Sequence, residues 1–191
     1  MSWIAVVPLR QGGEPKTRLA ARLPVGQRIA LSVEMARRVV AALGACPAVA
    51  RILILSSEPP PSGLSGEWVG DRGRGLNAEL DALRRDLDTP AMLVIHGDLP
   101  LIGPEDVAAL IVGAEQRSYA FAPDRHGAGT NAVAIGAGHD FTFAFGEGSL
   151  ARHCDRAPDA ALIRRPGLSL DVDTPGDLNA AIVAGFRWPA E

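Results

Sequence analysis

The sequence predicts an α/β protein built around a parallel sheet. Two apolar runs, Ile4 to Leu9 and Arg51 to Ser56, have the length and composition of buried strands. Between them, from Pro24 to Leu43, apolar side chains recur at helical spacing, and Gly44 follows as a C-cap. A strand, a helix and a second strand in this order are the unit from which parallel sheets are built.

Length and composition limit the class of protein. The chain has 191 residues, so we expect a single domain spanning 1–191 with a substantial core. Its net charge of −3 implies no basic face and argues against a nucleic-acid partner. No leader peptide opens the chain, and no apolar run approaches the roughly 18 residues of a membrane helix. We therefore expect a cytoplasmic protein without a membrane partner.

The remaining elements are predicted in order along the chain. Strands end at Gly, Pro or polar residues, and helices begin at Pro or after Gly. The predicted elements are a short strand Glu67 to Gly70, a helix Leu76 to Leu87, a strand Met92 to Ile95, a helix from Pro104 to near Gly113, strands Tyr119 to Pro123 and Val133 to Ile135, an extended segment Phe141 to Phe145, a helix from Ser149, a strand Leu168 to Val172, and a helix Pro175 to Ala184.

Asp98 follows the most apolar of these strands. The run Met92 to Ile95 has the composition of a strand buried on both faces, and His96-Gly97-Asp98 ends it abruptly. Ligands of open α/β sheets bind at this carboxyl edge. A carboxylate there can hold a metal ion against a phosphorylated substrate. The alternative is a turn or capping aspartate.

Lys16 is the single lysine among 19 basic residues. It lies with Arg18 in a glycine-bearing cationic loop directly after the first strand, where α/β proteins hold phosphates. Lysine is a compact point charge on a flexible stem, so a site requiring that shape would keep it where arginine prevails elsewhere. The alternative is a surface loop with solvated charges.

Further glycine-bearing turns carry short polar groups. Each one is either a ligand-binding turn or an ordinary turn or helix start. They are Gly75-Leu76-Asn77 at a helix start, Gly129-Thr130-Asn131 at a strand entrance, and Gly146-Glu147-Gly148-Ser149, where Ser149 is expected to cap a helix.

Two aspartates close the last predicted strand. On an extended strand Asp171 and Asp173 point to the same side, about 7 Å apart. Carboxylates so placed repel one another unless they share a cation, and with Asp98 they predict an oxygen-only Mg²⁺ site. Helix capping would explain Asp173 but not Asp171.

The motifs together resemble the CofC/FbiD family, the guanylyltransferases of coenzyme F420 biosynthesis. The matching stretches follow family order over nearly the whole chain: Val7-Pro8-Leu9 with Lys16-Thr17-Arg18-Leu19, Gly75-Leu76-Asn77, Gly97-Asp98-Leu99-Pro100-Leu101, Ala122-Pro123-Asp124 with Gly129-Thr130-Asn131, Phe145-Gly146-Glu147-Gly148-Ser149 with His153, and Leu170 to Leu178. Arg10 departs from the family's usual lysine, and the loop from Arg10 to Lys16 is short. The resemblance implies a MobA-like nucleotide-diphospho-sugar transferase (Rossmann-like) fold: a three-layer α/β/α arrangement with a mostly parallel sheet.

The resemblance also implies a reaction. GMP would pass from GTP to a phosphorylated three-carbon acid (2-phospho-L-lactate, phosphoenolpyruvate or 3-phospho-D-glycerate), with release of pyrophosphate. Lys16, Arg18 and Asp98 would be the catalytic residues, and Asp98, Asp171 and Asp173 would hold Mg²⁺. Thr130, Gly146 and Ser149 would bind the acceptor carboxylate. The nucleotide would contact Leu9, Gly75, Leu76 and Asn77.

Two other functions stay open at this point. One is a MobA-like molybdenum cofactor guanylyltransferase or a sugar-phosphate nucleotidyltransferase, although those families usually carry a longer glycine-rich loop before the lysine. The other is a non-catalytic nucleotide-binding protein, against which the intact Lys16 and Asp98 argue. The sequence does not decide the oligomeric state, and a homodimer stays open.

Overall fold

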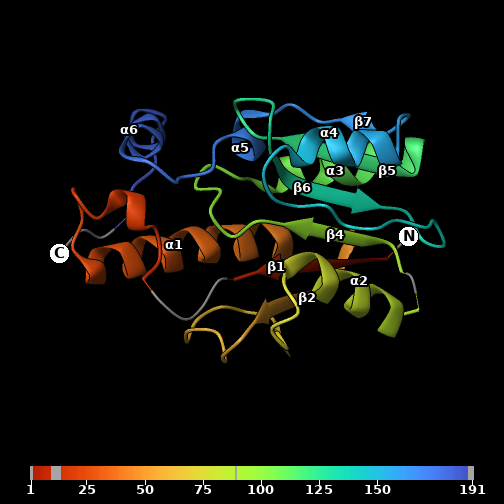
Figure 1. The fold of residues 1–191 in the computed structure, drawn as a ribbon, viewed down its shortest axis with the longest axis horizontal. Helices are drawn as coiled ribbons and strands as arrows, with labels where there is room; N and C mark the ends of the chain where they lie inside the picture. Colours follow the sequence, from red (N-terminus) through yellow and green to blue (C-terminus); the bar gives the residue numbers. More distant parts are fainter. Residues whose placement is uncertain (1, 10–13, 89, 189–191) are drawn as a thin grey trace.

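A computed structural model describes residues 2–9, 14–88 and 90–188. Within these residues seven strands form one sheet in the order β3-β2-β1-β4-β6-β5-β7 (Figure 1). Strand β6 is antiparallel to both of its neighbours, and every other pairing is parallel. The predicted mostly parallel sheet is confirmed.

The elements follow the predicted order with few changes. Their bounds are β1 Trp3–Pro8, the 3-10 helix η1 Thr17–Leu19, α1 Val25–Gly44, β2 Val49–Ser56, β3 Glu67–Gly70, α2 Leu76–Asp86, β4 Met92–Ile95, α3 Pro104–Arg117, β5 Tyr119–Pro123, β6 Thr130–Ile135, α4 Ser149–Arg156, β7 Ala161–Leu162, α5 Pro166–Ser169 and α6 Pro175–Val183.

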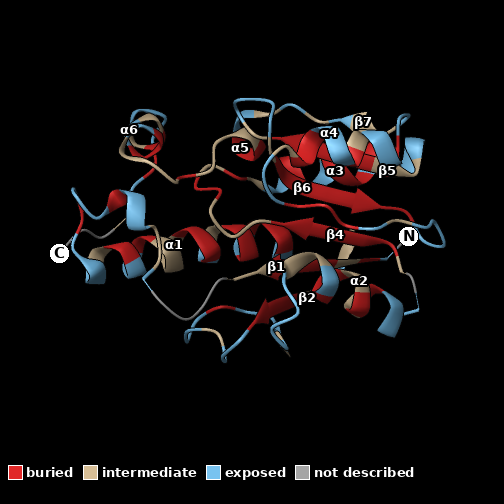
Figure 2. Ribbon diagram, in the orientation of Figure 1, coloured by how far each residue is buried: buried red, intermediate tan, exposed pale blue. Residues whose placement is uncertain are grey.

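Helices cover both faces of the sheet, as the three-layer prediction requires. On one face, α1 and α3 pack with alternate strand residues such as Ala5, Val7 and Leu93. On the other face, α2 and α4 pack with the intervening residues, such as Val6 and Val94. The central strands are therefore buried on both sides (Figure 2), which explains why their sequences are continuously apolar rather than alternating.

A third, smaller core lies beyond the end of the sheet. It joins η1, the first half of α1 and α6 through buried residues that include Leu19, Leu31 and Leu178. Figure 1 shows α6 beside the start of α1, away from the strands. This cluster fixes the loop that carries Lys16 against the C-terminal part of the chain.

The carboxyl edge of the parallel strands carries the polar turns. At this edge β1 ends at Pro8 and β4 ends at Ile95, whereas the reversed strand β6 begins there at Thr130. The turn after β4 passes close to Leu9, because a Cβ on Gly97 would lie 2.7 Å from Leu9 Cδ2 and would force that side chain to move. The sheet therefore delivers Asp98 and Thr130 to the same edge.

The predicted strand Leu168 to Val172 is wrong. Residues Pro166–Ser169 form the short helix α5, and the chain from Leu170 onward follows no strand. Helix α5 packs against β5 and β6, and each of these strands already has a partner on both edges, so neither offers a free edge. A backbone bond from Val172 N to Asp98 O at 3.2 Å is one of the contacts that hold the segment instead.

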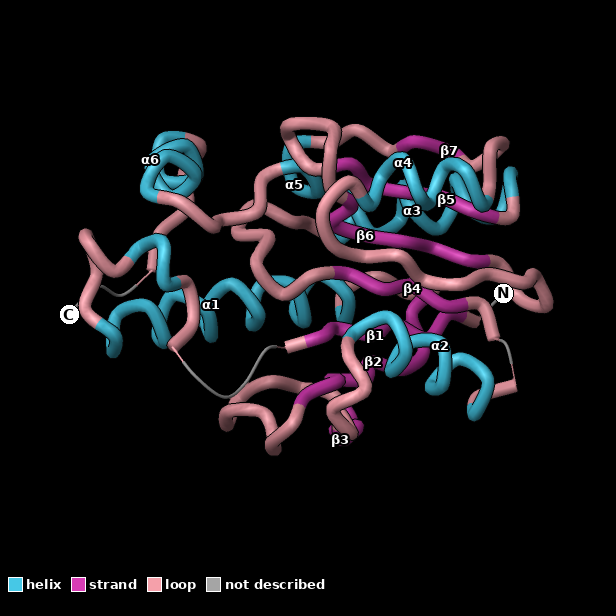
Figure 3. The backbone as a smooth tube through the Cα atoms, in the orientation of Figure 1, coloured by secondary structure: helices cyan, strands magenta, loops and turns pink. Residues whose placement is uncertain are grey.

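Two further differences are smaller. Helix α3 continues past the expected end near Gly113 to Arg117. Figure 3 shows the stretch that contains Phe141, Phe143 and Phe145 as a loop rather than a strand. The three aromatic rings still contact one another in sequence, at centroid distances of 5.5 and 6.0 Å.

The close approach of α5 gives a stability prediction. A Cβ on Gly167 would lie 2.8 Å from the backbone oxygen of Leu101, so we expect Gly167→Ala to destabilise the fold by about 1–3 kcal/mol. Gly26→Ala is the matched control, because a Cβ at this position would have nothing within 4 Å, and alanine favours the helix by up to about 1 kcal/mol. Urea unfolding of both variants measures the difference, and equal effects would contradict the close packing of α5.

Candidate active site

A cavity of about 1160 Å³ opens at the carboxyl edge of the sheet. Strands β1 and β2, the turn after β4, the loop before η1, helix α1, the starts of α2 and β6 and the segment after α5 all contribute to its wall. Every site residue predicted from the sequence lines this one cavity: Leu9, Lys16, Arg18, Gly75, Leu76, Asn77, Asp98, Thr130, Gly146, Ser149, Asp171 and Asp173. Arg10, the departure from the family pattern, lies outside the described residues.

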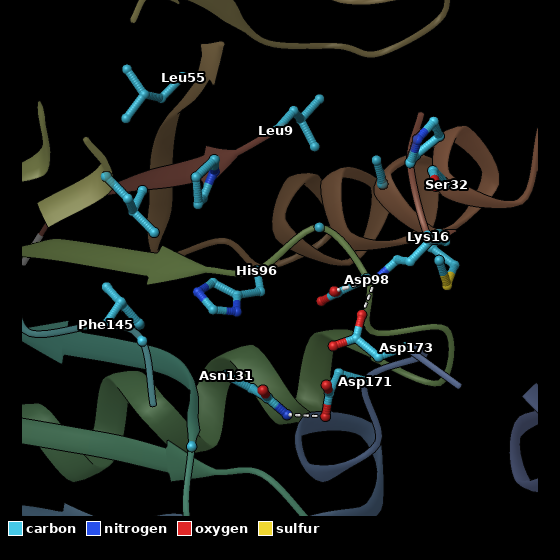
Figure 4. Close-up of a pocket in the computed structure, with 18 of the residues that line it drawn as sticks. Leu9, Lys16, Ser32, Leu55, His96, Asp98, Asn131, Phe145, Asp171 and Asp173 are labelled. Carbon is cyan, nitrogen blue, oxygen red and sulfur yellow. Dashed lines mark hydrogen bonds and ion pairs between the residues drawn. The ribbon is translucent and has the colours of Figure 1, made fainter. Parts of the chain in front are cut away.

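Lys16 joins two distant carboxylates across the cavity. Its ammonium group donates to Asp98 Oδ2 at 2.7 Å and to Asp173 Oδ1 at 2.8 Å (Figure 4). Its backbone adopts the left-handed conformation with φ of 50°, a sparsely populated region for a residue other than glycine. Burial would lower the pKa of Lys16, but the charges of both aspartates outweigh burial and raise it. Lys16 is therefore a fixed cation in the cavity wall.

The contact with Lys16 satisfies one of the two carboxylate oxygens of Asp98. Burial would raise the pKa of Asp98, whereas the charge of Lys16 and, after it, that of His96 hold the pKa below its ordinary value. Its other oxygen, Oδ1, is buried and has no hydrogen-bond partner among the described residues. A buried carboxylate oxygen without a partner is costly, and a cation or a donor from a ligand would relieve that cost.

Asp171 and Asp173 reach the same place without a strand. Asn131 holds the segment, because its amide donates to the carbonyls of Leu168 at 3.0 Å and Ser169 at 3.3 Å, and to Asp171 Oδ1 at 3.3 Å. Burial, followed by the charge of Asp98, raises the pKa of Asp171. The capping role considered for Asp173 belongs to Thr174, which forms a capping box with Asp177.

The three aspartates do not form a metal shell by themselves. In the described part of the chain no group of three Asp, Glu, His or Cys side chains is close enough to hold a metal ion. The donor set still fits Mg²⁺, because all donors are oxygens, Asp98 Oδ1 is unpartnered, and Mg²⁺ commonly takes one or two carboxylates with substrate phosphates completing its shell. The predicted Mg²⁺ stays a prediction.

At the end of the cavity formed by the start of α2, Glu79 organises the loop that ends at Gly75. Its carboxylate accepts the backbone N–H groups of Arg72 and Arg74, both at 3.0 Å, and the Arg74 guanidinium at 2.7 Å. The bond from the Arg74 side chain, which outweighs the opposing effect of burial, lowers the pKa of Glu79 to about 2. Gly75 then opens α2 with φ of 88°, so the conformation of this turn depends on a glycine and on Glu79.

Asn77 connects the two sides of the cavity. Its amide nitrogen donates to the carbonyl of Phe145 at 3.1 Å, and its amide oxygen accepts the Phe145 N–H at 2.8 Å. The sequence placed Asn77 in contact with the nucleotide, and that role stays a prediction. In this structure the amide ties the start of α2 to the loop that precedes Gly146.

At the end of the cavity formed by α4, the helix start differs by one residue from the prediction. Gly148, with φ of 65°, is the N-cap of α4, and Ser149 is its first helical residue, so the expected Ser149 cap is wrong. The N–H of Ser149 donates to Gly146 O and that of Leu150 to Ala128 O, both at 3.1 Å. These two amide groups are therefore engaged within the protein, and the Ser149 hydroxyl has no partner among the described residues.

The comparisons with known proteins agree with this geometry. A family model described as "Guanylyl transferase CofC like" matches residues 3–187. The chain belongs to this family. A phosphoenolpyruvate guanylyltransferase of Sphaerobacter thermophilus is 38% identical over 93% of this chain and 91% of its own. One from Geodermatophilus obscurus is 36% identical over 96% and 90%. The chain is thus a nucleotidyltransferase of the CofC-like guanylyltransferases.

Solved structures show the same fold at low sequence identity. A nucleotide-diphospho-sugar transferase structure from Desulfovibrio desulfuricans superposes with a TM-score of 0.72 at 17% identity, over 94% of this chain and 86% of that one. The 2-C-methyl-D-erythritol 4-phosphate cytidylyltransferase of Thermus thermophilus gives 0.57 at 17% identity, over 96% and 98%. None of the described helices is long and apolar enough to cross a membrane.

The sequence predicted no role for three residues that contact other parts of this CofC-like site. His96 lines the cavity 4.9 Å from the Phe145 ring, and its buried Nε2 lacks a partner among the described residues. Asp124 accepts three backbone N–H groups of the turn 126–129 at 2.9 to 3.1 Å. His153 contacts Thr130. Two of these roles could have been suspected from position in the sequence. His96 lies in the same turn as Asp98, and Asp124 directly follows strand β5.

The Glu79 contacts predict a pH dependence. Because folding lowers the pKa of Glu79 from 4.5 to about 2, its contribution to stability is complete above pH 4.5 and is lost as the pH falls toward 2. We expect Glu79→Gln to be less stable at pH 7 and to lose less stability on acidification, as urea unfolding from pH 7 to pH 3 would show. We also expect it to raise the KM for the nucleotide severalfold.

Glu67→Gln is the control for this prediction. Glu67 is also ion-paired, with Arg51 at 2.7 Å, but it lies on the exposed strand β3 and does not line the cavity. Its replacement should leave the nucleotide KM unchanged. If both variants changed the nucleotide KM alike, the positioning of Gly75 by Glu79 would be ruled out.

Proposed function

We propose that this enzyme transfers GMP from GTP to a phosphorylated three-carbon acid and releases pyrophosphate, as a cytoplasmic step of coenzyme F420 biosynthesis. The observation that carries this proposal is the bridge from Lys16 to Asp98 and Asp173, which sets one cation and two carboxylates where the nucleotide and acceptor sides of the cavity meet. The names of its relatives favour phosphoenolpyruvate among the candidate acceptors.

The chemistry requires no protein nucleophile. An oxygen of the acceptor phosphate attacks the α-phosphorus of GTP, the new P–O bond forms, and the bond from the α-phosphorus to the bridging oxygen of pyrophosphate breaks. Both reactants are anions, so charge neutralisation and alignment dominate the rate. When bound, Mg²⁺ would neutralise phosphate oxygens, and Asp98, Asp171 and Asp173 are the residues to hold it.

Two cations serve the departing pyrophosphate. Lys16 is held in place by its carboxylate contacts. Arg18 is exposed at the cavity and pairs with no carboxylate among the described residues, so it is free to meet phosphate oxygens. Together they receive the negative charge that develops as the leaving group departs.

Pyrophosphate release tests the proposal. The protein is mixed with GTP and, separately, phosphoenolpyruvate, 2-phospho-L-lactate or 3-phospho-D-glycerate, with ATP and CTP as nucleotide controls. We expect release with GTP and one of these acids and little with ATP or CTP. Release without any acid, or equal release with all three nucleotides, would contradict the assignment. A molybdenum cofactor or sugar-phosphate acceptor would instead leave all three acids inactive.

The role of Lys16 predicts a rescue by metal. Lys16→Met leaves two aspartates facing each other without their cation, which we expect to cost on the order of 1–3 kcal/mol of stability and most of the turnover. In the absence of nucleotide, millimolar Mg²⁺ should raise the Tm of this variant more than that of the parent. Lys16→Arg, which keeps the charge, should show no such excess. An identical Mg²⁺ response in all three proteins would contradict the shared cation position.

Asp171 should behave in the opposite way. It has no cationic partner among the described residues, and it lies near two other carboxylates, so its charge is unfavourable before a metal binds. We expect Asp171→Asn to raise the Tm by a few degrees without Mg²⁺, to abolish most of the Mg²⁺-dependent turnover and to weaken Mn²⁺ binding measured by calorimetry. A Tm loss without Mg²⁺ would show that Asp171 is structural.

A further inference from the structure

His153 is a buried polar side chain that the proposed reaction does not use. It lies on α4 with no exposed surface, and its ring packs against Phe121, Phe141 and Phe145 at centroid distances of 5.1 to 5.7 Å. Each ring nitrogen has one partner at 3.0 Å: Nε2 faces the backbone N–H of Ala144, and Nδ1 faces the hydroxyl of Thr130. The imidazole therefore links the loop before Gly146 to the start of β6.

The Ala144 contact decides which ring nitrogen carries the proton. A backbone N–H can only donate, so Nε2 must accept and cannot be protonated. Burial, followed by the charges of Arg156 and Arg152 and by His96, lowers the pKa of His153 to about 4, so the ring is neutral near pH 7. A neutral imidazole has one N–H, and here it must be at Nδ1.

The direction of the next hydrogen bond follows. The Nδ1–H of His153 donates to Thr130 Oγ1, so the Thr130 proton cannot point back at the ring. Among the described residues no other group is placed to accept that proton, and Thr130 lines the cavity. The O–H bond therefore points into the cavity and is polarised by the donor behind it.

We propose that His153 is a positioning residue that turns the Thr130 hydroxyl proton toward the cavity, where it donates to the carboxylate of the acceptor acid. This inference rests on the proposed function, because it needs the acceptor beside Thr130. A hydroxyl in water donates or accepts as its partner requires. With one of its two lone pairs engaged by His153 and its proton turned away from the ring, Thr130 presents that proton to the cavity and favours a ligand oxygen that accepts it.

Two substitutions separate the roles of the two ring nitrogens. The amide oxygen of Gln reaches the position of Nε2, so His153→Gln keeps a partner for Ala144 and loses the donor to Thr130. The amide nitrogen of Asn reaches the position of Nδ1, so His153→Asn keeps that donor and leaves Ala144 unpaired. A merely structural role predicts that the less stable variant binds the acceptor worse.

The expected results follow from which contact each variant keeps. With phosphoenolpyruvate as acceptor, His153→Gln should raise the acceptor KM roughly tenfold, as expected for one bond to a charged group, with little change in the GTP KM. His153→Asn should stay within about threefold of the parent for both substrates, even where its Tm is lower. The opposite order for the acceptor KM, or equal changes for GTP and acceptor, would overturn the proposal.

A double substitution tests whether His153 acts through Thr130. Thr130→Val removes the hydroxyl and should raise the acceptor KM by a similar factor. Thr130→Val combined with His153→Gln should then be no worse than Thr130→Val alone, because the second change removes support for a group already absent. Multiplying effects would show that His153 affects the acceptor by another route.

The proton position can also be measured without turnover. Long-range ¹H–¹⁵N spectra of the intact protein at pH 7 distinguish protonated from unprotonated ring nitrogens, and the loss of signals in His153→Gln assigns this residue among the 4 histidines. Protonation at Nδ1 is expected, and protonation at Nε2 would overturn the inference. If none of the three acids supported pyrophosphate release from GTP, the proposed function would be contradicted. If turnover occurred but the His153 proton were at Nε2, this inference alone would be contradicted.

Discussion

One ammonium group holds the site together. Lys16 contacts aspartates that are 82 and 157 residues away in the sequence, so it ties the loop after β1 to the end of β4 and to the segment before α6. Each of these segments is irregular, and none is held there by the sheet ladder. Partners taken from three separate parts of the chain converge only when the whole fold is formed.

The loop before Gly146 shows a second way of ordering an irregular segment. Side chains from two helices satisfy its backbone: Asp81 and Asn77 from α2, and His153 and Arg152 from α4. These side chains take the place that neighbouring strands occupy in a sheet. A backbone satisfied in this way keeps a defined shape without regular secondary structure, and so it can present a binding surface.

Much of the arrangement could be predicted from the sequence because it depends on local patterns. The apolar run before Asp98 and the helical spacing between the first two strands identify the parallel sheet, and the sheet determines which edge carries the polar turns. The segment 168–172 could not be predicted, because its alternating pattern suits a strand, whereas its first residues form α5 against β5 and β6, whose edges are already occupied. The contact of Lys16 with Asp98 was equally hidden, since residue spacing says nothing about such distant pairs. The displacement of the α4 cap by one residue, to Gly148, is within the ordinary variation of helix ends.

The reversal of β6 divides the cavity between two parts of the gene. Leu9, Leu55 and Gly75 come from the parallel strands and turns of the first half, whereas Thr130, Gly146 and Ser149 come from the reversed strand and the segments after it. Asp98 lies between the two sets in the sequence as it does in the cavity. Changes in one half can therefore alter what that side accepts while the other side keeps its specificity. Given the proposed function, such a division allows one scaffold to diversify its acceptors during evolution while it retains a single nucleotide donor.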